Sequence, residues 1–256
     1  YLINKLMVCI ITEWTGRLGN NILQIIRCIH YALLNNHSLI IFQEHHLLNE
    51  NKINLEIISN ENTNIIKDNF FSLKKFNMND IEPIIMKEYY QKYLKHIVKI
   101  NQSNIICDPN HLYIHIRSGD CFDPTIAHSY YVPPPLIYYE KIIENYEKVH
   151  IVYEDENNPC VNILKKNPKI TMYNINIEDS IRHLCKGENV GIGFGTFGLL
   201  IYFISTNIKN IYMPKYVYDE MPIGNWGIEV ILVDLPGYTK CGEWKCTQEQ
   251  LKLMVS

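Results

Sequence analysis

The sequence has no uninterrupted run of about 18 apolar residues, the length that a membrane-crossing helix needs, so no membrane span is expected. It also has no excess of positive charge. The formal net charge is −3, which excludes a global basic field for nucleic acid, and no nucleic-acid partner is expected. No signal peptide is recognisable, and the expected location is the cytoplasm.

None of the eight cysteines forms a C-x-x-C pair, so the sequence predicts no zinc site. Most lie singly within apolar runs, where cysteine behaves as a small buried hydrophobic residue. Cys241 and Cys246 flank a four-residue segment, and whether they close a small disulfide loop is left open. The cysteine pattern as a whole favours a reducing compartment.

The motif D-x-D, with which many enzymes acting on nucleotide sugars hold a metal ion, is absent as well. Without such a metal, a leaving diphosphate has to be neutralised by fixed cations and helix N-termini. His45 and His46 are not expected to bind a metal, because adjacent side chains in an extended segment point to opposite faces. The sequence therefore predicts no metal at its functional site.

The composition that is present, 47% hydrophobic and 20% charged residues, is typical of a globular protein with a substantial core. Residues 5–12 form an apolar run of strand length, a glycine-containing loop follows, and residues 21–35 have helical periodicity before a second apolar run at 38–43. A β-loop-α-β unit of this kind requires a right-handed crossover and predicts a parallel sheet.

Residues 44–106 carry weaker patterns, after which the α/β alternation restarts. In the weak region we expect a surface loop at 60–69, a helix at 89–100 and a linker at 101–104. Beyond it we expect strands at 112–117, 150–153, 170–174, 189–193, 210–213 and 229–233, and helices at 136–147, 160–166, 177–185, 198–206 and 247–254. The predicted organisation is an N-terminal Rossmann-like half (1–104), a C-terminal one (105–235), and a tail that packs back (236–256).

The strand that ends at Arg117 is the most informative segment. Leu112, Ile114 and Ile116 alternate with more polar residues, and residues 118–120 (Ser-Gly-Asp) supply a turn. Ligands bind at the carboxyl ends of strands in open α/β sheets, and a guanidinium there suits a phosphate or a carboxylate. A surface ion pair between Arg117 and Asp120 is the alternative.

Residues 193–198 match G-x-G-x-x-G between a predicted strand and a predicted helix, the pattern of a dinucleotide site. The match comes late in the chain, and Pro214 interrupts the strand that should deliver the acidic ribose ligand, Asp219. An anion site at the helix N-terminus, with Thr196 as a donor, requires neither a complete dinucleotide fold nor an acidic ribose ligand. The other explanation of the glycines is close packing of the helix against the strand. Asp155 ends another strand and is a candidate either for hydrogen bonds to a sugar or base or for a helix cap.

The segment from His115 to Asp120 (HIRSGD) resembles the H-x-R-x-G-D signature of fucosyltransferases that form α-1,2 linkages. Residues 16–21 (GRLGNN) are similar to their N-terminal G-x-L-G-N-Q segment, and residues 178–197 resemble their third motif. Two departures concern the donor region: Ser118 replaces the family's second arginine, and residues 193–196 (GFGT) replace its serine run. The resemblance implies a GT-B-like fold, in which two Rossmann-like halves face a cleft. It also implies GDP-fucose as the default donor, with another sugar nucleotide such as UDP-xylose as the alternative.

The resemblance further implies a metal-independent inverting glycosyltransferase. It would need no cofactor besides its GDP- or UDP-sugar donor and would act on an oligosaccharide or glycoprotein glycan. Divergent enzymes of this kind occur in large DNA viruses, whose proteins would work in the host cytoplasm. The donor-binding residues would be Gly16, Arg17, Gly19, Asn20, His115, Arg117, Asp155, Gly195, Thr196 and Phe197. Arg117 would bind the β-phosphate, and the backbone N–H groups of Thr196 and Phe197 would hold the same diphosphate.

Inversion requires a base for the acceptor hydroxyl, and Asp123 and His128 are the candidates, with Asp120 positioning the loop that carries Arg117. Two rival classes remain at this point. One is an NAD(P)-dependent Rossmann oxidoreductase that uses residues 193–198. The other is a non-catalytic carbohydrate-binding module.

Overall fold

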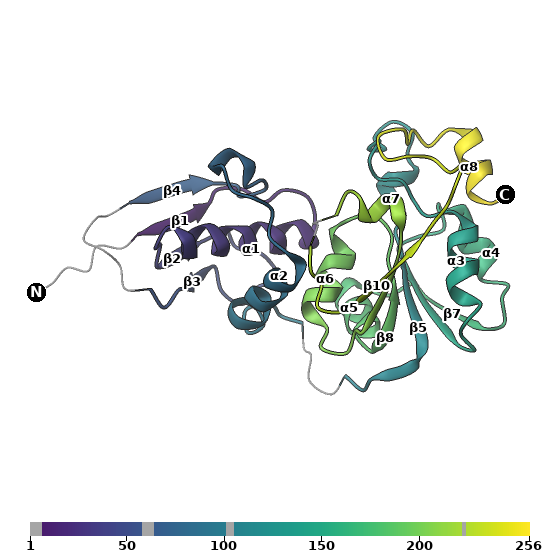
Figure 1. The fold of residues 1–256 in the computed structure, drawn as a ribbon, viewed down its shortest axis with the longest axis horizontal. Coiled ribbons are helices and arrows are strands. Elements are labelled where there is room, and N and C mark those ends of the chain that lie inside the picture. Colours follow the sequence, from purple (N-terminus) through teal and green to yellow (C-terminus); the bar gives the residue numbers. More distant parts are fainter. Residues whose placement is uncertain (1–6, 58–63, 101–104, 222–223) are drawn as a thin grey trace, which may run out of the picture. The chain divides into compact units, whose positions relative to one another are not determined.

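The computed structural model describes residues 7–57, 64–100, 105–221 and 224–256. The chain divides into two compact units, Tyr1–Ile100 and Asn101–Ser256 (Figure 1). The predicted linker at 101–104 lies outside the described residues. Each unit is an α/β structure with its own sheet.

The first unit contains a mixed four-stranded sheet with the order β3-β2-β1-β4. Strand β1 (Val8–Ile11) pairs in parallel with β2 (Leu39–Ile41) and β4 (Ile65–Asp68), and β3 (Lys52–Asn54) runs antiparallel to β2. Helix α1 (Leu18–Leu34) connects β1 to β2. The predicted parallel β-α-β unit is therefore confirmed, whereas the antiparallel β3 makes this sheet mixed.

Helix α1 is amphipathic, as its sequence predicts. Ile22, Ile25, Ile26 and Ile29 are all fully buried. A fully buried side chain of this size contributes roughly 1.5–3 kcal/mol to stability relative to the exposed state. The helix begins three residues earlier than predicted, at Leu18 directly after the glycine-containing loop.

Two predictions for the weak region are wrong. Of the surface loop expected at 60–69, residues 60–63 lie outside the described residues, and 65–68 form β4, whose exposed and half-exposed side chains give no apolar alternation. The helix expected at 89–100 starts earlier, because Pro83 occupies the first turn of α2 (Pro83–Tyr89), where proline is favoured. A π-helical turn η2 (Tyr90–Leu94) follows α2 and ends the helix before Ile100, and a short 3₁₀ turn η1 (Lys74–Phe76) precedes α2.

The second unit contains a parallel six-stranded sheet with the order β10-β9-β8-β5-β6-β7. Its strands are β5 (Asp108–Ile116), β6 (Val149–Tyr153), β7 (Ile170–Tyr173), β8 (Gly187–Gly191), β9 (Asn210–Pro214) and β10 (Glu229–Val233). The chain passes from β5 outward through β6 to β7, then returns to place β8, β9 and β10 on the other side of β5. This doubly wound order is compatible with a Rossmann-like fold, and it reverses between β5 and β8.

Helices cover both faces of this sheet. Helices α3 (Leu136–Ile143) and α4 (Pro159–Leu164) lie on one face, and α5 (Ile177–Leu184) and α6 (Thr196–Ile204) on the other (Figure 1). The alternation predicted for β5 is confirmed: Leu112, Ile114 and Ile116 share a core cluster with residues of α3 and α4. On the opposite face, the Tyr113 ring contacts His183 of α5 and the His115 ring contacts Phe197 of α6.

The C-terminal residues pack onto the second unit. After β9 come the short helix α7 (Lys215–Tyr218) and, at the end of the chain, α8 (Gln248–Met254). Trp244 is fully buried, and its Nε1 donates a hydrogen bond of 2.8 Å to the carbonyl of Cys121 in the 3₁₀ turn η3 (Gly119–Phe122). Met254 joins the core of α3 and α4.

Cys241 and Cys246 are both thiols, so the small disulfide loop is not formed. Among the described residues, no helix has both the length and the apolar character needed to cross a membrane.

Candidate functional site

Two loops meet at the carboxyl edge of the parallel sheet, where the strand order reverses. Arg117 directly follows β5, and Gly195 directly precedes α6, which follows β8. A Cβ atom placed on Gly195 would lie 2.7 Å from Nη1 of Arg117, and Gly195 has a φ of +111°. Only glycine combines this backbone conformation with this close approach. The arginine and the start of the helix are therefore brought together as the sequence predicts for an anion site.

The guanidinium of Arg117 is held on several sides. Its Nη2 donates to both carboxylate oxygens of Asp120, at 3.1 and 3.0 Å, so the predicted ion pair is present. The Tyr131 ring lies 4.4 Å from the guanidinium carbon. Burial alone would lower the pKa of Arg117, but Cys121 and Asp120 outweigh burial and raise the pKa, so the group stays charged.

The Nε atom of Arg117 is buried and has no hydrogen-bond partner among the described residues. Buried polar atoms in native structures almost always have a partner, so an unsatisfied donor calls for an explanation such as a bound ligand or water. The Arg117 side chain that carries this atom is only 21% exposed to solvent.

The turn after Arg117 is fixed by two carboxylates that follow β6. Asp155 accepts a short hydrogen bond from the hydroxyl of Ser118 and another, of 3.1 Å, from the Gly119 N–H. Glu154 accepts a 3.3 Å bond from the Ser118 N–H. Asp155 also accepts from the Asn157 N–H at 2.8 Å. Asp155 therefore positions the loop that carries Arg117, and its contact with a sugar or base stays a prediction. The alternative role as a helix cap is wrong, because Asn158 is the N-cap of α4.

Asn158 is a site residue that the sequence analysis misses. Its amide Nδ2 donates to the carbonyl of Arg117 at 3.2 Å, and its backbone N–H donates to the Ser118 hydroxyl at 3.1 Å. Its Oδ1 accepts from the Cys160 N–H at 3.0 Å and so caps α4. The sequence does contain a pattern for this cap, because an asparagine precedes Pro159 at the first helical position.

The glycine cluster at 193–198 serves two purposes. Gly195 admits the guanidinium, whereas a Cβ on Gly198 would lie 2.9 Å from the Ile192 side chain, so Gly198 allows α6 to pack closely on the segment after β8. The N-cap of α6 is Gly195, which has no side chain with which to cap the helix, and the first N–H groups of a helix have no partner within the helix. The ring of Phe197 in the first turn lies 4.4 Å from that of His115.

Asp219, the acidic residue that a dinucleotide site would require, does not lie at the end of a strand. Pro214 is the last residue of β9, paired with Val233, rather than an interruption of it. Asp219 lies beyond that strand, after α7. The end of β9 thus carries no carboxylate that could meet a ribose.

The two candidate bases differ in their surroundings. Asp123 is exposed and accepts hydrogen bonds from the Thr125 hydroxyl at 2.6 Å and its N–H at 2.9 Å, and these bonds lower the pKa of Asp123. His128 is also exposed, and its ring lies 4.8 Å from that of Tyr131, the residue that covers Arg117. Its Nδ1 faces the Tyr130 N–H at 3.3 Å. His128 is therefore connected to the Arg117 site through Tyr131.

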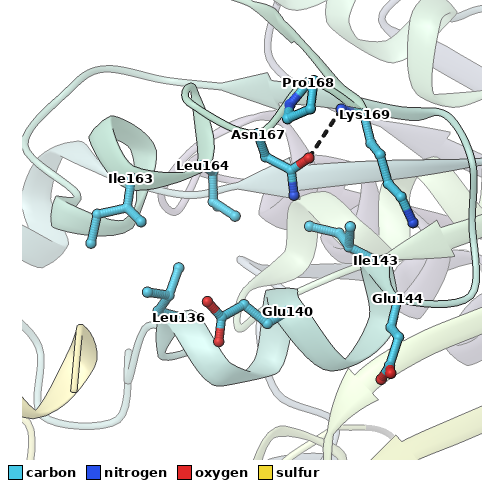
Figure 2. Close-up of a pocket in the computed structure, with 9 residues that line it drawn as sticks. All are labelled: Leu136, Glu140, Ile143, Glu144, Ile163, Leu164, Asn167, Pro168 and Lys169. Carbon is cyan, nitrogen blue, oxygen red and sulfur yellow. Dashed lines mark hydrogen bonds between the residues drawn. The ribbon is translucent and has the colours of Figure 1, made fainter.

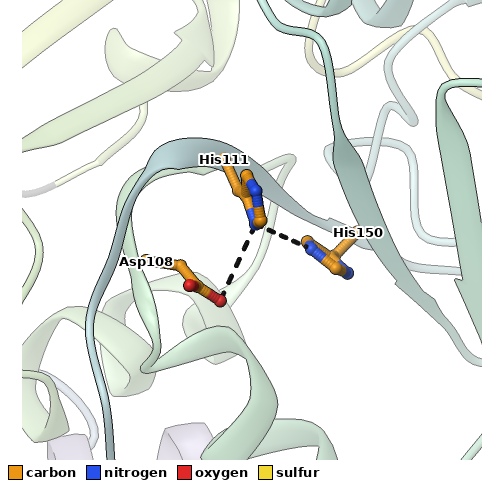
Figure 3. A group of neighbouring side chains, drawn as sticks. All are labelled: Asp108, His111 and His150. Atoms are coloured by element: carbon orange, nitrogen blue, oxygen red, sulfur yellow. Dashed lines mark hydrogen bonds and ion pairs between the residues drawn. The ribbon is translucent and has the colours of Figure 1, made fainter.

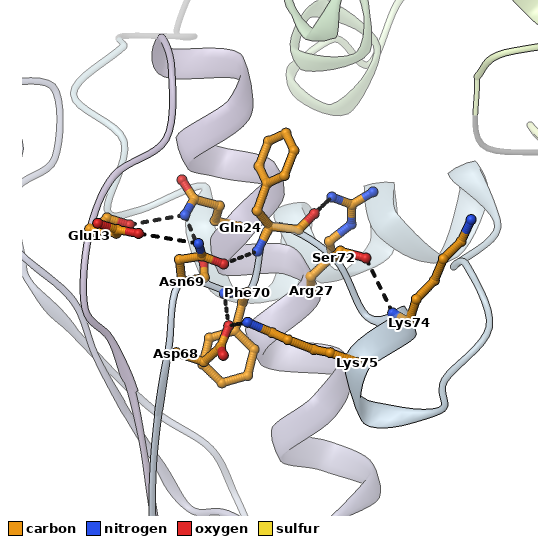
Figure 4. Close-up of polar contacts among 10 residues, drawn as sticks. Glu13, Gln24, Arg27, Asp68, Asn69, Phe70, Ser72, Lys74 and Lys75 are labelled. Carbon is orange, nitrogen blue, oxygen red and sulfur yellow. Dashed lines mark hydrogen bonds and ion pairs between the residues drawn. The ribbon is translucent and has the colours of Figure 1, made fainter.

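The glycine loop of the first unit lies between β1 and α1. Gly16 has a φ of +71°, and a Cβ atom placed on it would clash with the side-chain amide of Asn20. Arg17 is the N-cap of α1, and Gly19 is buried in the first turn of that helix. Figure 4 shows the polar contacts next to this loop. Buried Gln24, which the sequence analysis misses, donates to the carbonyls of Glu13 and Asn69 at 3.0 and 2.6 Å.

His45 and His46 do not point apart as an extended segment would require. Their rings stack at 4.6 Å with an angle of 21° between them, because the chain turns there. The prediction that the two side chains point to opposite faces is therefore wrong. The pair is not part of a group of three or more metal-ligating side chains among the described residues.

A hollow of about 300 Å³ lies beside α3 and α4 (Figure 2). Its lining consists of Leu136, Glu140, Ile143, Glu144, Ile163, Leu164, Asn167, Pro168 and Lys169. None of these residues belongs to the loops that meet at Arg117, and the hollow is separate from that site.

Comparisons of this chain with protein-family models, with curated proteins and with solved structures give no match.

Proposed function

We propose that this protein is a metal-independent inverting glycosyltransferase that moves a sugar from a nucleotide-sugar donor to a hydroxyl of an oligosaccharide or glycoprotein glycan. The observation that carries the proposal is the approach of Arg117 to Gly195 at the N-terminus of α6. A fixed cation and a helix N-terminus at the switch point of a doubly wound sheet suit a nucleoside diphosphate.

In the proposed reaction, the bond between the anomeric carbon of the sugar and the β-phosphate oxygen breaks, and negative charge develops on the leaving diphosphate. Arg117 and the first N–H groups of α6, those of Thr196 and Phe197, would stabilise that charge without reorganising. Asp120, Asp155 and Asn158 contribute indirectly, because they fix the Arg117 loop.

The acceptor hydroxyl attacks the anomeric carbon from the opposite face, and its proton passes to a base. We assign this role to His128, whose ring contacts Tyr131 beside Arg117. Asp123 is the weaker candidate, because a carboxylate with a lowered pKa holds a proton poorly.

Fucose from GDP-fucose is the default sugar, and one observation favours another donor such as UDP-xylose. Ser118 is fully buried and its hydroxyl bonds to Asp155, so it offers the donor no group in place of a second arginine. The proposed site thus has one arginine fewer with which to hold the donor than the fucosyltransferases that the sequence resembles.

A thermal-shift panel of GDP-sugars, UDP-sugars and NAD(P), each with and without EDTA, tests the proposal. Each shift is taken between nucleotide-free and nucleotide-loaded samples in the same buffer. We expect a shift with one sugar nucleotide that EDTA leaves unchanged, and transfer of that sugar to a glycan acceptor. A shift with NAD(P) alone would favour an oxidoreductase, and binding of glycans without any nucleotide would favour a carbohydrate-binding module.

A further inference from the structure

Three side chains with metal-ligating atoms gather at the amino end of the parallel sheet. Asp108 and His111 belong to β5, and His150 belongs to the neighbouring β6 (Figure 3). Nδ1 of His111 lies 3.2 Å from Nε2 of His150 and 3.7 Å from Oδ2 of Asp108. One ligand atom from each residue lies within 4.8 Å of the others.

These separations match those between the ligands of a tetrahedral ion. Zinc binds imidazole nitrogen and carboxylate oxygen at about 2.0–2.2 Å, which places neighbouring ligand atoms roughly 3.4 Å apart in a tetrahedron. The two distances at His111 lie on either side of this value. A small ion between the three atoms therefore needs little movement of the side chains.

Neighbouring hydroxyl groups orient two of the three side chains. The Tyr173 hydroxyl lies 3.0 Å from Nδ1 of His150, and the Tyr113 hydroxyl donates to Oδ2 of Asp108 at 2.5 Å. A metal-ligating histidine commonly uses its other ring nitrogen in this way, which fixes the tautomer and turns the ligating nitrogen toward the ion. Nε2 is the nitrogen of His150 that faces His111.

We propose that Asp108, His111 and His150 form a binding site for a divalent transition-metal cation of the zinc type. Two imidazoles and one carboxylate supply three ligands, and water completes a tetrahedron. The site combines a buried anchor with an open side: His150 is 6% exposed, whereas the Asp108 side chain is 42% exposed and leaves an entry path.

This site is separate from the proposed donor site. Arg117 lies six positions after His111 in extended chain, a distance of roughly 20 Å along β5. The cation would join β5 to β6 and stabilise the sheet, and it takes no part in the sugar transfer. The sequence analysis misses the site because His111 and His150 are 39 positions apart and follow no metal-binding spacing.

The test titrates the untagged, chelator-treated full chain with Co²⁺ and, separately, with Zn²⁺. We expect one ion per chain and the intense visible absorption of tetrahedral Co²⁺, without a thiolate charge-transfer band. His111→Gln and Asp108→Asn should each weaken binding at least about tenfold. We expect both variants to fold, because His111 and Asp108 are partly exposed and the asparagine oxygen in Asp108→Asn can still accept the hydrogen bond from Tyr113. His96→Gln, at an exposed histidine of the first unit, is the matched control and should bind like the wild type.

The proposal is overturned if the wild type binds no Co²⁺ or Zn²⁺ at micromolar concentrations. It is also overturned if His111→Gln and Asp108→Asn bind as tightly as His96→Gln, or if the cobalt spectrum shows thiolate ligands. Because no nucleotide is present, these outcomes are independent of the proposed glycosyltransferase activity.

Discussion

Arg117 and Gly195 are fitted to each other: Nη1 of Arg117 lies 2.7 Å from where the Cβ of any other residue at 195 would be. The contact joins the end of β5 to the start of α6 across the point where the strand order reverses. It places a permanent cation at a helix N-terminus, and the proposed function depends on this arrangement.

Gly195→Ala should separate the arginine from the helix. We expect nucleotide affinity to fall at least tenfold, because the new methyl group displaces the guanidinium. The positive φ of +111° should also cost roughly 1–3 kcal/mol of stability. Gly237→Ala is the matched control, because Gly237 has a φ of +79° with open space around its Cα. Titration calorimetry with GDP and UDP checks both variants. Unchanged affinity in Gly195→Ala would show that the contact does not matter for binding.

Asp155→Ala should destabilise the protein by about 2–4 kcal/mol, because it leaves the buried Ser118 hydroxyl and the Gly119 N–H without their charged acceptor. Asp219→Ala removes an exposed carboxylate of the same unit and should change stability by less than about 0.5 kcal/mol. Urea unfolding followed by circular dichroism measures both. Equal stability of the two variants would contradict the role assigned to Asp155.

His128→Asn should lower the rate of sugar transfer about 100-fold or more while the donor still binds, because a general base acts in the chemical step. Asp123→Asn is the comparison, and its rate of sugar transfer should fall less than about tenfold. A transition state with a developing oxocarbenium ion depends little on a second, weakly basic carboxylate. Single-turnover transfer assays separate the chemical step from donor binding. The reverse order of the two effects would make Asp123 the base.

Strong periodicity made much of the second unit predictable. The alternation in β5 identified both its faces, because each face packs on a different pair of helices. The position of Arg117 after that strand and of Gly195 before α6 also followed from local sequence. In the first unit, β3 and β4 are short and have little buried surface, so they carry no apolar pattern to recognise.

The roles of individual polar residues were less predictable, because they depend on contacts between distant positions. Asp155 bonds to a turn 36 and 37 residues away, and Gln24 to a carbonyl 45 residues away. Neither partner can be found before the strand order is known. The sequence could show that Asp155 ends a strand. It could not show that the carboxylate would bond to the turn at Ser118 and Gly119.

Stability should fall as the pH decreases from about 6.5 to about 4. Burial, followed by nearby positive charge, lowers the pKa of His150 and of His183 to about 4, against an ordinary value of 6.5. Between these values the unfolded chain binds more protons than the folded one, so the free energy of unfolding falls as the pH falls. His150 alone would contribute at most about 3 kcal/mol.

Urea unfolding of the chelator-treated protein at several pH values between 4 and 7 measures this dependence. His150→Gln should flatten it, whereas the exposed control His96→Gln should retain it. A wild-type stability that does not change over this range would contradict the buried, neutral state of these histidines.

The most direct test of the central claim is the affinity for GDP and UDP, measured by titration calorimetry in the presence of EDTA. Arg117→Ala is compared with Arg182→Ala, which removes an arginine of α5 that is 43% exposed and paired with Asp179. If Arg117 holds the diphosphate, Arg182→Ala binds the nucleotide like the wild type. Arg117→Ala, still folded, then binds about 10- to 100-fold more weakly, the loss expected for a charge-assisted hydrogen-bonding partner. Equal affinity of the two variants would contradict the claim.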